Sequence, residues 1–471
     1  MIISKEKFII IFLNIFVILV SLLILFDSKV HDVRYFSLFG TIITIILFGL
    51  LIKIKKKILD PFIMMFFSFC MFQFGQFYMY AFNVKYDYYV FWDKFYSTFC
   101  GNASLLNVQK YTILAIELFG LAGIITYNEQ KYDKKSDILL NKDNASFMLA
   151  AKILFVFSSI PMLIITVAQI LVVHQYGYIG IRSGDSSVVI SQLNVFNKLS
   201  VFFLPMTIFL WIFHNNNRKK QLFYEALIIV NAVIYLYIGQ RTVSLSLLMV
   251  LVLLKQNFSS SQNKKSTIKI AISIFVAVIL ANFSAIVRNR TNVTINMSDL
   301  IFGGIVDFVG GCGWSCFPLM VVMESCPRYI PFSYGKSYLI SMLGIIPSFI
   351  DPTGTLQKLI STVDENWLTE YVGINFGAGY SLVAESYVNF AWFGLVAIFI
   401  IGLLIGLLLN IRTSNRSDFG YYVRYAMLYT LFTLPRRGVF WFFNSIFYYI
   451  IVIIVLKKVI SCTIMRQKKQ I

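Results

Sequence analysis

Long apolar runs alternate with short polar segments along the whole chain. Many runs approach the roughly 20 residues that a helix needs to cross the hydrocarbon of a bilayer, whereas the strands of a membrane barrel would show short segments of alternating polarity. We therefore expect an all-α, polytopic membrane protein that forms one membrane domain over residues 1–471. About twelve spans are predicted, at residues 8–26, 35–54, 61–82, 108–127, 147–173, 197–213, 222–238, 242–255, 268–286, 388–410, 419–434 and 439–456.

A stretch of about 100 residues, 287–387, separates the ninth predicted span from the tenth. Parts of it are apolar, namely Leu300–Val309 and Tyr338–Ile350, which predicts short helices that lie on the membrane or dip into it. We expect this stretch to form a large loop region on the extracytoplasmic face.

The composition fits this picture and limits the function. Of the 471 residues, 58% are hydrophobic and 13% are charged, against roughly 25% charged residues in a typical soluble domain. Cytosolic enzymes, nucleic-acid-binding proteins and disordered proteins are therefore excluded. The net charge of +19 fits lysine-rich cytoplasmic segments, as the positive-inside rule requires. With Lys5, Lys53–Lys57 and Lys457–Lys469 on one face, both termini are predicted to be cytoplasmic.

The arginines are distributed differently from the lysines between the two predicted faces of the membrane. On the predicted topology, 8 of the 13 arginines face outward, and five of these eight lie at the mouths of spans. The outward arginines are Arg34, Arg182, Arg241, Arg288, Arg290, Arg328, Arg436 and Arg437, and the five at span mouths are Arg241, Arg288, Arg290, Arg436 and Arg437.

Such a group of arginines indicates an anionic ligand at the outer membrane surface. A guanidinium group is always charged and offers a planar fork of donors that matches phosphate oxygens. Ionisable groups at membrane depth are costly and commonly mark a substrate path. We therefore expect the five arginines at span mouths to hold a diphosphate headgroup just above the bilayer. The alternatives are binding of ordinary phospholipid phosphates and pairing with nearby acids.

Acidic and aromatic residues on the same face add further candidates. Glu385 stands at the entry to the tenth span, where a carboxylate would act either as a general base for a sugar hydroxyl or as a partner for an arginine. Tyr338 and Tyr380 belong to a set of outer-loop aromatic residues that suit sugar faces but are equally typical of the interfacial aromatic belt.

Several motifs are absent from the sequence. It contains no Walker loop, dinucleotide fingerprint, His-Glu-x-x-His motif or nucleophile elbow. No cofactor and no metal are therefore expected. There is also no cytoplasmic domain with an Asp-x-Asp motif for a nucleotide-sugar, so glycosyl transfer would have to use a lipid-linked donor.

Five motifs in the C-terminal half, taken in order, resemble the oligosaccharide repeat-unit polymerases of the Wzy type. They are Ile238–Thr242, Val287–Arg290, Gly335–Tyr338 with Ile345–Ser348, Gly379–Glu385 with Asn389–Gly394, and Pro435–Val439. The resemblance covers about residues 220–456 and the number of spans.

The resemblance implies polymerisation of oligosaccharide units carried on undecaprenyl diphosphate, at the outer face of the bacterial inner membrane. It implies metal-independent glycosyl transfer, with membrane lipids, a chain-length regulator and a flippase as candidate partners and no role for nucleic acid. We assign Glu385, Arg241 and Arg288 to catalysis, and Arg290, Arg436, Arg437, Tyr380 and Tyr338 to substrate binding.

Two other functions stay open. An O-antigen ligase has a similar architecture but uses a histidine in the large outer loop, and 287–387 contains none. A repeat-unit flippase would show two related halves and charged residues within several spans, whereas the basic residues here gather at the outer mouths.

Overall fold

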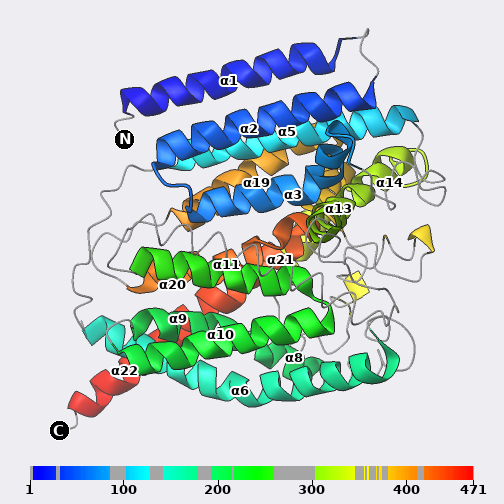
Figure 1. The fold of residues 1–471 in the computed structure, drawn as a ribbon. Coiled ribbons are helices and arrows are strands. Elements are labelled where there is room, and N and C mark those ends of the chain that lie inside the picture. Colours follow the sequence, from blue (N-terminus) through cyan, green and yellow to red (C-terminus); the bar gives the residue numbers. More distant parts are fainter. Residues whose placement is uncertain are drawn as a thin grey trace. The chain divides into compact units, whose positions relative to one another are not determined.

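A computed structural model describes residues 4–27, 32–84, 102–127, 142–177, 193–214, 217–258, 303–344, 355, 358–359, 368, 371–373, 380–410 and 418–469. The secondary structure of these residues is helical (Figure 1), which confirms the predicted all-α class. The chain divides into two compact units. The first unit comprises Met1–Glu129, Phe302–Asn410 and Leu431–Phe443, and the second comprises Gln130–Ile301, Ile411–Thr430 and Asn444–Ile471.

Ten helical segments among the described residues are long and apolar enough to cross a membrane. Nine of them coincide with predicted spans, and the tenth, Gly304–Ser325, lies within the predicted outer region. Predicted span 242–255 lies in a helix, 419–434 overlaps a helix of only 14 residues, and 268–286 lies outside the described residues. The protein is thus a multi-pass helical membrane protein, and twelve spans stays a prediction.

The first unit is built around α5 (Asn102–Thr126), which packs against α1, α2, α3, α14 and α19. Short 3-10 turns at Trp314–Cys316 and Ala391–Phe393 join α13 to α14 and α18 to α19. Its other helices are α1 (Lys5–Leu25), α2 (Val33–Lys55), α3 (Pro61–Ala81), α13 (Gly304–Gly313), α14 (Phe317–Ser325), α15 (Lys336–Leu343), α18 (Leu382–Phe390), α19 (Gly394–Leu409) and the beginning of α21 (Val439–Ile446).

Glycines on α19 allow it to pack closely against α5. A Cβ atom on Gly406 would lie 2.1 Å from Thr126 Oγ1, and one on Gly402 would lie 2.9 Å from Ala122 Cβ. Two small residues four apart let helix backbones approach closely where lipid supplies no hydrophobic driving force. The sequence Gly402-x-x-x-Gly406 therefore determines how α19 packs on α5.

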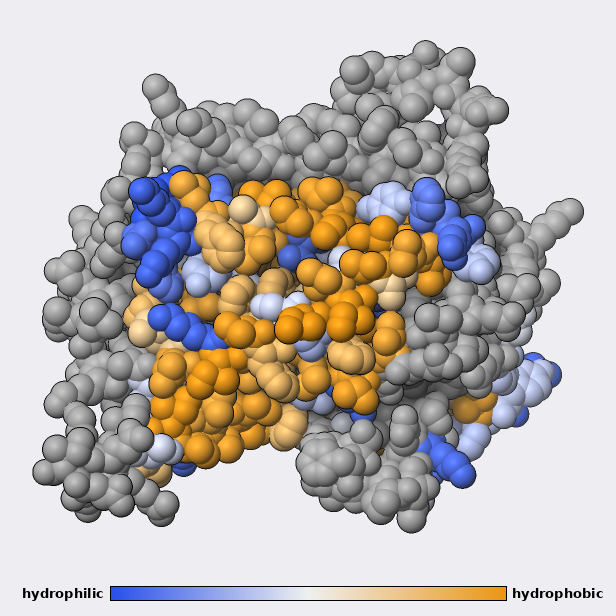
Figure 2. All heavy atoms as spheres, turned by 90° about the horizontal axis from the view of Figure 1, so that it is seen from below, coloured by the Kyte–Doolittle hydropathy of each residue, from blue (hydrophilic) through white to orange (hydrophobic). Residues whose placement is uncertain are grey.

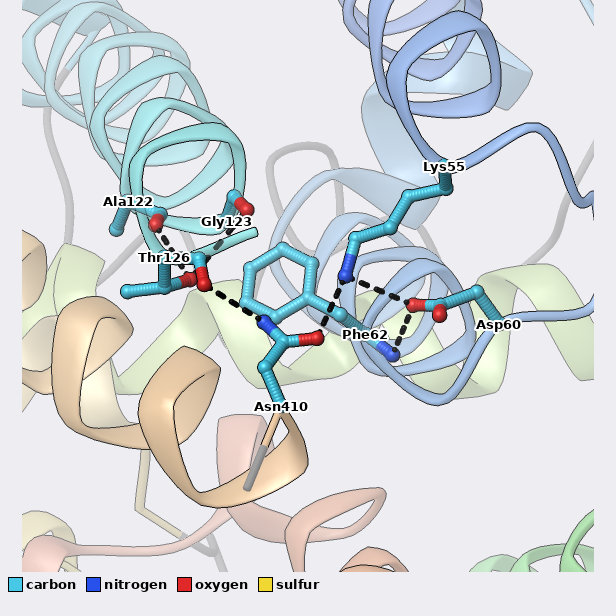
Figure 3. A network of polar contacts seen from close by, with 7 residues as sticks. All are labelled: Lys55, Asp60, Phe62, Ala122, Gly123, Thr126 and Asn410. Carbon is cyan, nitrogen blue, oxygen red and sulfur yellow. Dashed lines mark hydrogen bonds and ion pairs between the residues drawn. The ribbon is translucent and has the colours of Figure 1, made fainter. Parts of the chain in front are cut away.

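A buried polar cluster ties together the ends of four helices (Figure 3). Lys55 at the end of α2 forms a 3.2 Å ion pair with Asp60 and donates to Asn410 Oδ1 at 3.0 Å. Asp60 also caps α3 by accepting the Phe62 N–H at 2.9 Å. Asn410 follows α19, and its Nδ2 donates to the Thr126 carbonyl at the end of α5. Each buried charge or carbonyl thus gains a partner, which burial requires.

Helix α1 joins this unit through hydrogen bonds to α5. Lys7 Nζ donates to the carbonyls of Ile125 and Tyr127, at 2.7 and 2.6 Å, where the C-terminal end of a helix favours a cation. Further along α1, the Ser21 hydroxyl donates to the fully buried carboxyl group of Glu117. Hydrogen bonds of this kind hold membrane helices together where apolar packing alone does not.

The second unit contains α6 (Lys142–Tyr176), α8 (Asn194–Ser200), α9 (Phe203–Phe213), α10 (Arg218–Ile238), α11 (Arg241–Phe258), α20 (Asp418–Leu431) and α22 (Val452–Lys469). Helices α10 and α11 form a tight hairpin at Gly239, whose φ of +93° is in the left-handed region that favours glycine. The Gln240 N–H closes the turn by donating to the Tyr235 carbonyl at 2.8 Å.

Large apolar side chains cover the outside of the helices. On α6, Val156, Ile160 and Leu163 are each about two-thirds exposed, at the spacing of one helical face. Figure 2 shows apolar residues gathered into a broad face with hydrophilic residues at its edges. A face of this size would be a liability in water, so it is explained by contact with lipid.

Candidate functional site

The start of α18 brings Glu385 into the interior of the first unit. Ser381 is extended and caps the helix by accepting the Ala384 N–H at 3.0 Å, which places Glu385 in the first helical turn. A carboxylate in the first turn is favoured by the helix dipole. The side chain is nevertheless buried, with 1% of its surface exposed, so its oxygens need partners from the protein.

Both carboxyl oxygens of Glu385 accept hydrogen bonds. The Ser337 hydroxyl donates to Oε1 at 2.9 Å, and the Val439 N–H donates to Oε2 at 2.6 Å. Val439 begins α21, so the carboxylate satisfies one of the free N–H groups at that helix start. Gly438 makes this approach feasible, because a Cβ atom there would lie 3.0 Å from Oε2.

Asn389, one helical turn after Glu385, organises the other side of the network. Its Nδ2 donates to Ser337 Oγ at 2.7 Å and to the Glu385 carbonyl at 2.8 Å, while its Oδ1 accepts the Gly335 N–H at 3.0 Å. Asn389 is fully buried. The network therefore links the start of α15, helix α18 and the start of α21.

The loop Pro435–Gly438 carries Arg436 and Arg437. Its backbone is fixed from α3, because Gln73 Nε2 donates to the Pro435 carbonyl at 2.6 Å. Its C-terminal side is fixed by the bond from Val439 to Glu385. We call residues 435–438 the arginine loop.

Arg436 and Arg437 are both half-buried. Arg437 lies 4.3 Å from the centre of the Trp441 ring, in a cation–π contact that orients it. Within the described part of the chain, the Arg436 guanidinium has no hydrogen-bond or ion-pair partner. The loop thus presents a preformed positive charge.

The two predicted tyrosines, Tyr380 and Tyr338, contact different parts of the site. Tyr380 is 2% exposed, and its Cδ1 would lie 3.3 Å from a Cβ on Gly438, so it packs beneath the arginine loop. Tyr338 packs against Phe390, with ring centres 5.9 Å apart. Burial, with the nearby Glu385 charge as a further cause, raises the pKa of the Tyr338 hydroxyl well above its ordinary value.

The structure brings five of the eight predicted site residues into one region of the first unit, namely Glu385, Arg436, Arg437, Tyr338 and Tyr380. Arg241 begins α11 in the second unit, and Arg288 and Arg290 lie outside the described residues.

Sequence reasoning missed Ser337, Asn389 and the Val439 N–H. Ser337 and Val439 form their contacts with Glu385 across 48 and 54 residues of sequence. Asn389 could have been identified from the sequence, because a polar residue four positions after Glu385 lies on the same face of the helix.

A comparison with protein-family models matches residues 7–469 to O-antigen polysaccharide polymerase Wzy. Searches of the curated proteins and of the solved structures found no significant match. Members of this family polymerise lipid-linked oligosaccharide repeat units in a membrane. Because the match spans nearly the whole chain, and because the helical membrane fold agrees with it, this protein belongs to the Wzy family of O-antigen polysaccharide polymerases.

Proposed function

We propose that this protein polymerises repeat units carried on undecaprenyl diphosphate, at the outer face of the bacterial inner membrane, with both termini in the cytoplasm. A flippase and a chain-length regulator are its proposed partners. The observation that carries the site proposal is the arginine loop, in which two adjacent arginines sit on a backbone held from α3 and from α18.

In this proposal Arg436 and Arg437 bind the diphosphate of the donor lipid. As the glycosidic bond to the carrier breaks, negative charge develops on the leaving diphosphate. Fixed positive groups that need no reorganisation stabilise such charge effectively. The guanidinium charges supply this stabilisation, so the proposed transfer is metal-independent. Arg241 and Arg288 stay proposed catalytic residues, and Arg290 stays a proposed substrate-binding residue.

Glu385 acts in this proposal by positioning the arginine loop. Both of its oxygens already accept hydrogen bonds, and it is 1% exposed. A general base must come within hydrogen-bond reach of the proton that it removes, and this geometry favours the positioning role. Glu385 accepts the backbone N–H of Val439, two residues after Arg437. It thereby fixes the backbone position from which the arginine side chains extend.

A deletion strain tests the proposed polymerase activity. Loss of the gene should leave the surface glycan capped at a single repeat unit, and the wild-type gene should restore the ladder. An unchanged ladder in the deletion strain would refute the proposal. Long chains that accumulate on the lipid carrier would instead identify a ligase.

Variants of the arginine loop test the site. Arg436→Ala and Arg437→Ala should abolish the ladder while the protein still reaches the membrane, and Arg436→Lys should restore it only in part, because lysine lacks the bidentate fork. Arg34→Ala, which removes an outward arginine outside the loop, is the matched control and should keep the ladder. Full restoration by lysine at both positions would contradict bidentate diphosphate binding.

A further inference from the structure

The turn that precedes α15 exposes the side chain of Tyr334. Tyr334 is 81% exposed, and its φ of +45° lies in the left-handed region that bulky residues rarely adopt. Gly335 follows with a φ of +84°. Backbone conformations of this kind persist only where the surroundings enforce them, and they cluster at functional sites.

The surroundings that enforce this turn belong to α18. The Gly335 N–H donates to Asn389 Oδ1 at 3.0 Å, and the Ser333 N–H donates to the Val388 carbonyl at 2.9 Å. Gly335 also lies against Phe390, whose Cζ would be 3.2 Å from a Cβ at this position. The turn is therefore attached to the same helix that carries Glu385.

Among the described aromatic rings, Phe332 is the one that contacts the ring of Tyr334. Phe332 meets it edge-on, with ring centres 6.4 Å apart, and Phe332 packs in turn against Tyr387 at 6.2 Å. Within the described residues, the Tyr334 hydroxyl has no hydrogen-bond partner. A rigid aromatic surface and a free hydroxyl are thus available to a ligand.

The same hydrogen-bond network connects this turn to the arginine loop. Ser337, three residues after Tyr334, donates to Glu385, and Glu385 accepts the N–H of Val439. Three residues span at most about 11 Å between Cα atoms. The exposed ring is therefore held close to the residues that fix Arg436 and Arg437.

We propose that Tyr334 is a stacking platform for a sugar ring of the saccharide substrate. One face of a pyranose ring exposes C–H groups that match the negative face of an aromatic ring, and the ring hydroxyls match the tyrosine hydroxyl. The proposal rests on the polymerase function, because it names the part of the site that holds the saccharide while the arginine loop holds the diphosphate. An interfacial belt tyrosine would need no strained, pinned turn.

Substitutions at Tyr334 distinguish the effect of the aromatic ring from the effect of the backbone conformation. Tyr334→Phe and Tyr334→Trp keep an aromatic face and should retain long chains in the complemented deletion strain. Tyr334→Ala and Tyr334→Gly should shorten the ladder. Glycine tolerates the positive φ, so a defect in Tyr334→Gly cannot come from backbone strain. Tyr35→Ala is the control, since Tyr35 is an exposed tyrosine of the same unit, outside this turn.

Direct binding provides a second readout. The probe is the single repeat-unit oligosaccharide released by mild acid from the lipid fraction of the deletion strain, and its binding to purified full-length protein is measured by saturation-transfer NMR. Tyr334→Ala and Tyr334→Gly should weaken binding by about tenfold, and Tyr35→Ala should not.

Wild-type binding and ladder length in both Tyr334→Ala and Tyr334→Gly would overturn the proposal. If the wild-type gene fails to restore any ladder, the polymerase proposal fails instead, and the NMR comparison still decides whether Tyr334 binds the saccharide.

Discussion

The buried ion pair between Lys55 and Asp60 supports a quantitative test of how the first unit is held together (Figure 3). The side chain of Lys55 is fully buried and that of Asp60 is 7% exposed. Removing one member of such a pair leaves a charge that is neither solvated nor neutralised, at a cost of about 3–5 kcal/mol. Asn410 at 3.0 Å and the Tyr127 ring, 4.8 Å from Lys55 Nζ, remain as partial partners, so we expect a cost near the lower end.

Asp60→Asn is the most informative change, because asparagine caps a helix about as well as aspartate. The bond to the Phe62 N–H is retained and only the charge is lost. We expect a loss of about 3 kcal/mol, which corresponds to about 6–12 °C in melting temperature for a domain of 150–250 residues. Lys55→Met combined with Asp60→Asn removes both charges and should recover most of this loss, since a neutral replacement of a buried pair is often harmless.

The melting temperatures of four forms are compared: the wild type, Asp60→Asn, Lys55→Met and the double variant. Each is measured by heating the purified protein in detergent and following the loss of its monodisperse elution peak. Their midpoints give a double-mutant cycle with Lys55→Met as the fourth corner. The reasoning is refuted if Asp60→Asn has the same melting temperature as the wild type. It is also refuted if the decrease in melting temperature of the double variant equals the sum of the decreases of the two single variants. Lys56→Met is the control, because its 3.7 Å pair with Glu6 is solvent-exposed and is worth little.

Three further changes test other contacts. Gly438→Ala places a Cβ 3.0 Å from Glu385 Oε2 and should cost about 1–3 kcal/mol and shorten the glycan ladder. Gly49→Ala is the control, because it has no atom within 4 Å of its Cβ and lies inside α2, where alanine favours the helix; it should neither destabilise the protein nor shorten the ladder. Gly406→Val should lower the yield of folded protein, because its Cβ would lie 2.1 Å from Thr126 Oγ1; a normal yield would contradict the tight α19–α5 contact. Ser21→Ala removes the hydrogen bond to Glu117 and should lower the unfolding free energy in detergent by about 0.6 kcal/mol, with Ser461→Ala, in the second unit, as the control.

Much of the fold follows from local pattern. An apolar run of spanning length forms a helix in lipid because its backbone must satisfy its own hydrogen bonds there, and nine predicted spans coincide with candidate spans of the structure. The α10–α11 hairpin at Gly239 likewise follows from a residue that tolerates positive φ. Gly304–Ser325 was not predicted as a candidate span, because its glycines interrupt the apolar run. Those glycines let it pack on α3, where Gly313 would place a Cβ 2.3 Å from the Gln76 nitrogen.

The sequence by itself determined that this protein lies in a membrane and is helical, and it predicted arginines on the outward face, where few basic residues are expected. These are properties of composition and of spacing along one helix. The tertiary structure decided what Glu385 does. Its partners Ser337 and Val439 are far from it in sequence, and no local periodicity predicts which buried donors a carboxylate meets. The physical reason is that a buried carboxylate must be matched by hydrogen-bond donors wherever the fold supplies them, and here the fold supplies them from α15 and from the start of α21.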